Sequence, residues 1–359
     1  MKNFKKFFCA IFLFFFIHLQ GLFAKEIEQF KSEKLSPKKF IITSEKNEEI
    51  NNFLQQTSKE FFKHSITISL DKLNGKADEI VYDGAKILSH LEWDIKNLNM
   101  LKFNFNSQFS DYVGARIKFS NAINGGNGKM VDSDWIGKKY DGNIDHENWT
   151  HRSISDVKIQ KAQLFDISGF LNIYKDEFKF NLGYKYELFK WRDYGGSYIY
   201  SSTNANQTES IGFRDLVGNF NFQRGITYQQ QFSTPYIGFE YQKELFDKQI
   251  YANIFVNYSS LVNAHDTDIH HQRNLKFDEY FKNGKYYNWG ANIFGKVKEN
   301  IYLGLGYEYT YYPLNKGYTI IKYLDTNKSY IDYDSAGIRN KYSTISLNLK
   351  YNFTTNLNF

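Results

Sequence analysis

Residues 178–188 read FKFNLGYKYEL, with an aromatic residue or leucine at every second position and Lys, Asn, Gly or Glu between them. Successive side chains of a β-strand point to opposite faces, whereas a helix repeats about every 3.6 residues. The same alternation recurs at 250–258, 301–311 and 345–353. The pattern predicts strands with one apolar face and one polar face.

A soluble β-sandwich would show a similar alternation, but segment length and spacing favour a membrane barrel. The alternating segments are near the roughly ten residues that a tilted strand needs to cross a bilayer. Short and long connections also take turns along the chain. Short turns are expected at 97–99, 175–176, 246–248 and 298–300, and outer loops near 83–84 and at 119–153, 200–223, 265–284 and 314–341.

Five outer loops and four short turns join ten strands between about residues 66 and 353. The composition agrees, because 28 Tyr and 34 Phe against 3 Pro suit strands, and a mean hydropathy of −0.55 disfavours a bundle of membrane helices. The sequence therefore predicts an all-β fold, a ten-stranded antiparallel transmembrane β-barrel with extended extracellular loops. An even strand number closes such a sheet without an edge.

The first 24 residues have the pattern of a signal peptide. Three lysines precede an apolar run at 7–17, and Ala24 supplies a small residue for cleavage. A retained anchor is the alternative, but the run is short and is followed by polar His18. Cleavage would also remove Cys9, the only cysteine, so no thiol chemistry is expected in the mature chain.

The remaining chain divides into three expected parts. Residues 25–64 form a Lys/Glu-rich periplasmic extension, with apolar residues at helical spacing over 46–63; residues 65–353 form the barrel, and 354–359 form a tail. The formal net charge is +6, but no charge run is dense enough to indicate nucleic-acid binding.

Two loop segments concentrate side chains that could carry chemistry. One contains Asp132 and Asp134, and the other contains Asp266, Asp268 and His270, each at spacing i, i+2. In extended backbone, such residues project from one face. Neighbouring carboxylates raise at least one carboxyl pKa, and a carboxylate beside histidine favours the imidazolium. This cluster suits the activation of water by a His–Asp pair, with a second carboxylate pair handling another proton.

Simpler interpretations stay open on the residues alone. Acidic pairs in outer loops are often solvated or bind a divalent cation, and His265, His270 and His271 could be metal ligands, although their spacing matches no zinc signature. There is also a parity problem. If the even positions of 250–258 face lipid, an unbroken strand would point Asp266 and Asp268 the same way. A bulge between 259 and 264 is therefore required.

Several separated blocks resemble the omptins, the outer-membrane endopeptidases of Gram-negative bacteria. The blocks are GKADEIVY (75–82), LEW (91–93), MVDSDW (130–135), NWT (148–150), GGSYIYSS (195–202), GFRD (212–215), PYIG (235–238) and DTDIH (266–270). Their order along about residues 61–353 makes the resemblance more specific than any single block.

The resemblance implies an aspartic-type endopeptidase whose active site faces the cell exterior. Asp268 and His270 would orient and deprotonate the attacking water, and Asp132 with Asp134 would form the facing carboxylate pair. Glu79 and Asp266 would hold the basic side chain that precedes the scissile bond, although Glu79 taken alone reads as an ordinary strand-end acid. The implied substrates are polypeptides cut beside Arg or Lys, with no metal, no other cofactor and no covalent intermediate, by a monomeric enzyme.

The chain also departs from the family pattern. His151 stands where an acid often follows the Trp-Thr of the second loop, which leaves the preference after the scissile bond open. Omptins need lipopolysaccharide, and Tyr184 matches the aromatic residue of their lipid site, but Tyr186, Leu188 and Gln231 replace an acid and two arginines. Whether lipopolysaccharide is required here stays open. The alternative function is a non-proteolytic barrel serving as adhesin or receptor, against which the retention of all four catalytic positions argues.

Overall fold

A computed structural model describes residues 61–137, 148–174, 177–221, 224–247 and 249–356. Within those ranges no helix is long and apolar enough to cross a membrane. The strands are β1 (Phe61–Asp83), β2 (Lys86–Gln108), β3 (Val113–Ala122), β4 (Asn127–Asp134), β5 (His151–Tyr174), β6 (Phe178–Tyr200), β7 (Leu216–Asn219), β8 (Ile226–Leu245), β9 (Ile250–His270), β10 (Leu275–Lys298), β11 (Ile301–Tyr323) and β12 (Ser329–Asn356).

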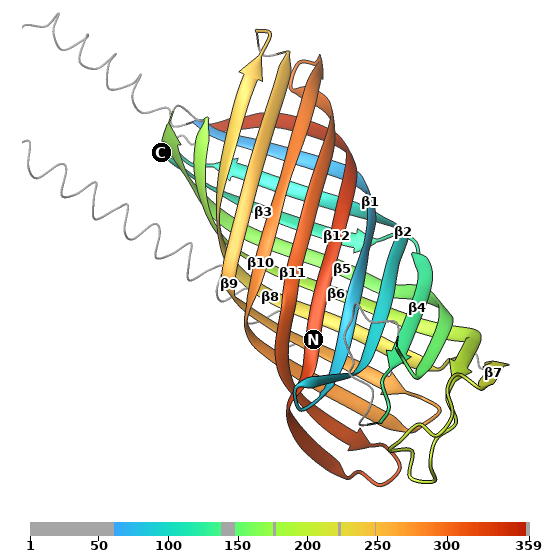
Figure 1. The fold of residues 1–359 in the computed structure, drawn as a ribbon. Helices are drawn as coiled ribbons and strands as arrows, with labels where there is room; N and C mark the ends of the chain where they lie inside the picture. Colours follow the sequence, from blue (N-terminus) through green and yellow to red (C-terminus); the bar gives the residue numbers. More distant parts are fainter. Residues whose placement is uncertain (1–60, 138–147, 175–176, 222–223, 248, 357–359) are drawn as a thin grey trace, which may run out of the picture. The chain divides into compact units, whose positions relative to one another are not determined.

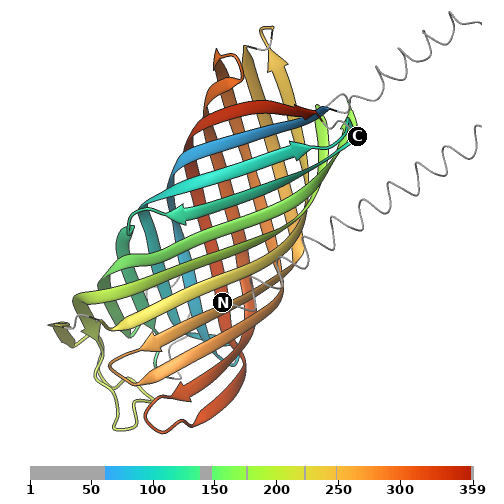
Figure 2. The same ribbon diagram turned by 180° about the vertical axis from the view of Figure 1, so that it is seen from behind.

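These strands form one closed antiparallel sheet (Figures 1 and 2). β3 and β4 each pair with both β2 and β5, so together they occupy one place in the wall. β7 pairs only with β6, at the end of that strand. The ring therefore has ten places, and β1 closes it by pairing with β12 from Phe61↔Asn356 to Val81↔Ala336. The predicted ten-stranded barrel is confirmed.

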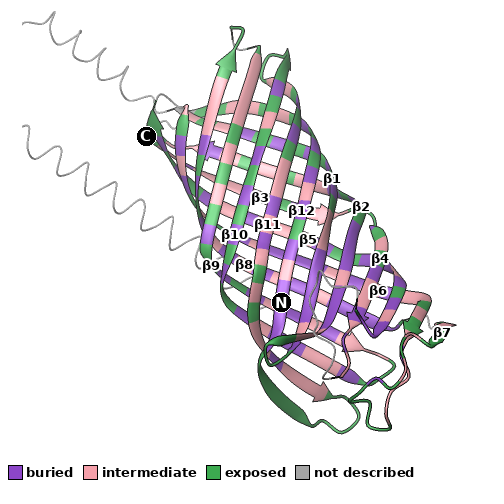
Figure 3. Ribbon diagram, in the orientation of Figure 1, coloured by how far each residue is buried: buried purple, intermediate pink, exposed green. Residues whose placement is uncertain are grey.

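Exposed apolar side chains recur along the outer surface of the strands, and exposed and buried positions alternate along many strands in Figure 3. Ile68 on β1, Leu305 on β11 and Leu347 on β12 are 41%, 59% and 54% exposed, while Ser69 and Ser346 beside them point inward and are buried. A regular apolar outer face of this kind is typical of a barrel wall in contact with lipid. On β10, Trp289 and Tyr287 are exposed in the same wall, as expected for an aromatic girdle at a membrane interface.

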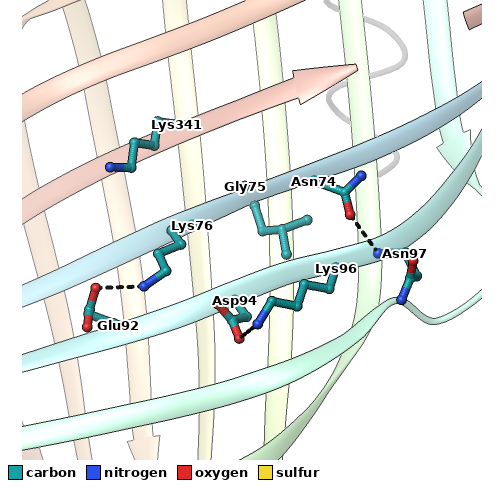
Figure 4. Close-up of a pocket in the computed structure, with 9 residues that line it drawn as sticks. Asn74, Gly75, Lys76, Glu92, Asp94, Lys96, Asn97 and Lys341 are labelled. Atoms are coloured by element: carbon teal, nitrogen blue, oxygen red, sulfur yellow. Dashed lines mark hydrogen bonds and ion pairs between the residues drawn. The ribbon is translucent and has the colours of Figure 1, made fainter. Parts of the chain in front are cut away.

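The expected turn at 97–99 is wrong. β2 runs through it to Gln108, and the pairing with β1 instead shifts by one residue at this point. Asn97 has a φ of 52°, and its backbone N–H donates to Oδ1 of Asn74 at 3.0 Å (Figure 4). Asn tolerates the left-handed backbone conformation, which occurs both in turns and in bulges. The local sequence therefore does not distinguish a turn from a bulge at this position.

The outer loops are also shorter than expected, because strands replace much of them. Most of 265–284 belongs to β9 and β10, and most of 314–341 belongs to β11 and β12, leaving only 271–274 and 324–328 as connections. Similarly, 119–153 contains β4, and 200–223 contains β7. These strand ends contain many charged and polar residues among apolar ones, as is possible above the lipid belt, where a regular apolar outer face is not required.

The other short turns lie where expected, between strands that end near 174, 245 and 298. Residues 175–176 and 248 themselves are outside the described part of the chain, as are the expected signal peptide and most of the extension. Of the helix expected over 46–63, only 61–63 are described, and they begin β1. β12 continues to Asn356, so strand pairing extends into the expected tail.

Candidate active site

A change of parity in β9 turns the predicted acids inward. Ile254, Val256 and Tyr258 are exposed, Ser260 and Leu261 are both exposed, and the even-numbered residues from Val262 to Asp268 are buried. The ladders with β8 and β10 are displaced at the same place, with Ser233↔Asn263 followed by Ile237↔Tyr258. The bulge that the sequence requires between 259 and 264 is thus present. It places Asp266, Asp268 and His270 in the barrel mouth.

Asp268 and His270 form a close pair on this inward face. Nε2 of His270 lies 2.5 Å from Oδ2 of Asp268, and the ring of Phe277 meets the imidazole edge-on at 5.3 Å. The Asp268 side chain is buried, and that of His270 is 18% exposed. Burial lowers the pKa of His270, but the carboxylate of Asp268 outweighs it and raises that pKa above its usual value. With Nε2 donating to Asp268, Nδ1 is left as the basic nitrogen.

Asp132 and Asp134 lie on β4 and also face the interior. Burial raises the pKa of both, and the charge of Asp132 adds to the large increase at Asp134. The hydroxyl of Ser89 donates to Oδ1 of Asp132 at 3.1 Å, and the charge of His270 lowers the pKa of Asp132. The carboxyl pair therefore stands across the mouth from the His–Asp pair, close enough for electrostatic coupling.

Three buried carboxyl groups form an acidic pocket beside this centre, which we define as Glu79 on β1, Asp266 on β9 and Glu279 on β10. Glu279 lies directly opposite Asp266 in the β9–β10 ladder and accepts a hydrogen bond from Thr319 at 3.0 Å. Burial, with neighbouring acids, raises the pKa of Glu79 and Asp266 well above the usual range and that of Glu279 to about 8. Oε2 of both glutamates and Oδ1 of Asp266 are buried without a hydrogen-bond partner. Each group thus has one carboxyl oxygen available to a cationic side chain, whose charge would favour the ionised carboxylates.

An aromatic layer supports the pocket from below. Tyr228 stacks on Trp93 at 5.2 Å and Trp191 at 5.8 Å between ring centroids, and its hydroxyl donates to Oδ2 of Asp266 at 2.9 Å. Gln230 donates to the Tyr228 hydroxyl at 2.8 Å and accepts from Asn340 of β12 at 2.8 Å. These bonds cross the barrel lumen and fix the acids against a water-excluding base.

The structure brings the six residues singled out by the sequence together in the mouth, and beside them it places Ser89, Tyr228, Gln230 and Glu279, which sequence reasoning missed. Glu279 is one of 39 acidic residues, and only the register with Asp266 distinguishes it from its neighbour Asp278. Asp278 points the other way and pairs with Lys276 and Lys322. Strand alternation would have found Glu279 only if the strand limits had been known.

The histidines considered as metal ligands have separate roles. His265 stacks on Tyr280, His270 pairs with Asp268, and His271 contacts the Thr227 hydroxyl at 2.8 Å. Among the described residues, Asp78, His90 and Glu92 do lie close together, on the outer face of the wall. Asp78 there bonds His90 at 2.8 Å and Arg339 at 2.7 Å, so a cation already occupies part of this cluster.

A hollow of about 630 Å³ opens on the outer face of β1 and β2 rather than on the mouth (Figure 4). Lys76 pairs with Glu92 across it at 3.0 Å, and Lys96 pairs with Asp94 at 2.5 Å. These are partly exposed ion pairs, and the residues that line the hollow include none of Asp132, Asp134, Asp268 and His270. The acidic pocket, not this hollow, is the candidate binding site.

The residues that depart from the family pattern lie in two places. Tyr184 is 39% exposed on β6, and on the same wall the hydroxyl of Tyr186 donates to Gln231 at 2.8 Å beside the nearly buried Leu188. His151 lies opposite Asp134 in the β4–β5 ladder, and its ring is 4.9 Å from that of Tyr200. Gln231 pairs with His265 on the outward side of β9, so the former set is on the outside of the wall, whereas His151 borders Asp134.

Comparison with known proteins gives a consistent picture. The model of the Omptin family matches residues 60–353. The plasminogen activator of Yersinia pestis is 32% identical over 301 residues, covering 80% of this chain and 89% of that protein, and the outer membrane protease OmpP of Escherichia coli (strain K12) is 26% identical over 311 residues, covering 83% and 94%. The crystal structure of the outer membrane protease OmpT from Escherichia coli superposes with a TM-score of 0.74 at 26% identity, covering 81% of this chain and 97% of that one.

The buried acids should make the barrel less stable as the pH rises. Because the pKa of Glu279 is about 8 in the folded protein against 4.5 ordinarily, the folded state keeps a proton that the unfolded chain has released between about pH 5 and 8. The unfolding free energy should therefore fall across this window, by at most about 1.4 kcal/mol per pH unit for each such proton. In Glu279→Gln the fall should be smaller.

Urea unfolding of the refolded barrel at pH 5 and pH 8 measures this difference. Glu299→Gln is the matched control, because Glu299 is exposed in the β10–β11 turn. An equal fall in the parent and in Glu279→Gln would contradict the assignment of a buried, protonated Glu279.

Proposed function

The chain belongs to the omptin family, a peptidase of the Gram-negative outer membrane, and on that premise we propose that it cleaves polypeptides beside basic residues by activating water between two side-chain pairs. The observation that carries the proposal is the His270–Asp268 pair, at 2.5 Å, facing Asp132 and Asp134 in a mouth that also contains an acidic pocket. An adhesin needs none of these buried, uncompensated acids.

In the proposed mechanism, water lies between the two pairs. Nδ1 of His270 takes a proton as the water oxygen attacks the scissile carbonyl, and Asp268 stabilises the imidazolium that forms. The raised pKa of Asp134 keeps a proton on the Asp132–Asp134 pair, and this proton hydrogen-bonds the developing oxyanion. Collapse of the tetrahedral intermediate returns the proton from His270 to the leaving amine. His270 and the Asp132–Asp134 pair carry the protons that move in this scheme, which uses neither a metal nor a covalent enzyme intermediate.

The acidic pocket would hold the side chain before the scissile bond. Glu79 and Asp266 are buried with oxygen atoms unpaired, and a guanidinium can pair with two carboxylates at once. A neutral side chain would leave those acids desolvated and unpaired, so it should be rejected. The proposed substrates are therefore polypeptides containing Arg or Lys, and the proposed active form is a monomer, since one mouth contains every group named here.

Lipopolysaccharide is the proposed partner of the outer wall near Tyr184. The arginines of the family pattern are absent at Leu188 and Gln231, but Lys161 and Lys190 face each other in the β5–β6 ladder of the same wall. An ammonium attracts phosphate as a point charge, without the bidentate geometry of arginine. We therefore propose that lipid binding is weaker than the family pattern implies.

Removal of the base should abolish turnover. His270→Ala or Asp268→Ala should each lower kcat by about 10²-fold or more, because general acid–base groups contribute about 10² to 10⁴. The measurement is hydrolysis of an internally quenched Arg peptide by refolded protein with lipopolysaccharide, with and without a chelator. His265→Ala is the control, since His265 lies on the same strand but faces outward. Full activity in His270→Ala with an intact barrel would refute the mechanism.

Specificity for Arg should disappear when the pocket is neutralised. The parent should cleave peptides with Arg faster than those with Lys, and those with Lys faster than those with Gln, at the position before the bond. The double variant Glu79→Gln/Asp266→Asn should lose this order, as measured by kcat/KM for the three peptides. Glu92→Gln on the outer wall is the control. A double variant that still prefers Arg would show that these acids do not form the pocket.

Arginines restored to the outer wall should strengthen lipid binding. Leu188→Arg with Gln231→Arg should raise the affinity for lipopolysaccharide, because each guanidinium can form paired hydrogen bonds to phosphate. The measurement is titration of lipid-free refolded protein with lipopolysaccharide, with Ile331→Arg, far along β12, as control. If the parent already binds tightly and the arginines change neither binding nor activity, lipid is bound elsewhere.

A further inference from the structure

A second cleft borders the catalytic acids on the side away from the acidic pocket. It has a volume of about 820 Å³ and is lined by Tyr198 and Tyr200 of β6, Leu216 and Asn219 of β7, Phe220 and Asn221 after β7, and Gln272 after β9. None of these seven residues carries a charge. We call it the aromatic cleft, and none of the functions proposed so far uses it.

Strand register ties the cleft directly to the catalytic acids. Asp132, Ser153, Tyr198 and Gly218 lie directly opposite one another across β4, β5, β6 and β7. The next row is Asp134, His151, Tyr200 and Leu216. Residues directly opposite in an antiparallel sheet share a face. Both rows therefore begin at a catalytic acid and end in the aromatic cleft.

The aromatic rings form one continuous surface. Tyr198 lies 4.7 Å from Tyr200 and 4.9 Å from Phe220 between ring centroids. A Cβ atom on Gly218 would be 2.4 Å from the Tyr198 hydroxyl, so only glycine lets that ring lie flat across β7. Leu216 remains 48% exposed beside them. An apolar surface that is not covered by the protein itself is a binding surface for an apolar group.

The opposite wall comes from the loop that follows the catalytic histidine. Gln272 is two residues beyond His270 and is held by a hydrogen bond to the carbonyl of Arg224 at 3.2 Å. His271 between them contacts the hydroxyl of Thr227 at 2.8 Å. The aromatic cleft therefore continues the gap between the two catalytic pairs. Its one wall is in register with Asp132 and Asp134, and its other wall comes directly after His270 in the chain.

The order of strands around the ring indicates on which side of the scissile bond the aromatic cleft lies. From β4, the acidic pocket is reached through β2 to β1, whereas the aromatic cleft is reached through β5 to β6 and β7. The two sites are therefore on opposite sides of the catalytic pairs. If the acidic pocket holds the residue before the scissile bond, as proposed above, the aromatic cleft receives residues after it.

The distance from Asp132 and Asp134 to the aromatic cleft indicates which substrate residue after the scissile bond reaches it. Tyr198 and Tyr200 are two strands from the catalytic acids, and neighbouring strands are about 4.8 Å apart, which gives roughly 10 Å. An extended peptide advances about 3.3 Å per residue, so this distance spans about three residues. We propose that the aromatic cleft is a specificity subsite for a large apolar side chain, aromatic or leucine, at the second or third position after the scissile bond.

The test compares Arg peptides that differ only at those two positions, carrying Phe, Leu, Ser or Glu. For the parent, kcat/KM should be about tenfold higher with Phe or Leu than with Ser, the usual effect of filling an apolar subsite, and Glu should be cleaved least. In Phe220→Ala and in Leu216→Ser, the ratio of Phe to Ser peptides should fall toward one.

Val217→Ser is the matched control. Val217 is 74% exposed next to Leu216 and is not among the residues lining the cleft, so the Phe-to-Ser ratio should stay at the parent value. Phe220→Leu keeps an apolar surface and should retain most of the preference, even if Phe220→Ala perturbs the loop.

The outcomes separate this inference from the proposed function on which it rests. A parent that cleaves no Arg peptide overturns the proposed function and this inference with it. A parent that cleaves Arg peptides with equal kcat/KM for Phe, Leu and Ser overturns the aromatic cleft alone. An unchanged preference in both Phe220→Ala and Leu216→Ser would likewise show that other residues make the selection.

Discussion

The ladder between β1 and β12 is the interaction on which the rest of this structure depends. Within lipid, an unpaired backbone N–H or C=O costs several kcal/mol, so a sheet can remain there only when it has no edge. Pairing from Phe61↔Asn356 to Val81↔Ala336 removes both edges along the whole wall. Once the sheet is closed, each residue must face either the lumen or the outside. Whether a functional side chain reaches the lumen then depends on whether its position in the strand is odd or even, and a one-residue shift reverses this.

Bulges are where the chain changes parity, and they separate the lipid-embedded part from the mouth. In β9, one displacement between Tyr258 and Val262 sends the even-numbered residues from lipid to lumen, so that a strand with an apolar outer face continues into a row of inward acids. The shift at Asn97 changes the parity of β2 in the same way. Odd-numbered residues such as Phe103 and Phe105 face outward on one side of it, and Leu91 and Trp93 face the lumen on the other. A regular barrel of this sequence would display its acids to the solvent outside.

The mouth concentrates buried acids above an aromatic layer, and this arrangement opposes stability. Glu79, Asp266 and Glu279 have raised pKa values because burial and mutual repulsion disfavour their ionised forms. A chain selected for stability alone would not keep them, whereas a site that binds a cation gains affinity from acids left unpaired in its absence. The uncharged aromatic cleft on the other side has the opposite character. In the proposed function, these two sites would set the direction in which a peptide lies across the mouth.

The sequence by itself determined the barrel and its ten places, because alternation over about ten residues is a local pattern. Acids and a histidine at spacing i, i+2 singled out Asp132, Asp134, Asp266, Asp268 and His270, whereas Glu79 was singled out only by the resemblance to the omptins. The sequence also showed that β9 must contain a bulge, since the acids and the lipid face conflicted in parity. It could not distinguish the bulge at Asn97 from a turn, because Asn suits both conformations. Only the tertiary structure placed Glu279 beside Asp266, Tyr228 beneath them, and Tyr198 and Leu216 in line with Asp132 and Asp134. Those relations depend on the register between strands that are distant in sequence, and register is set by the closed sheet as a whole.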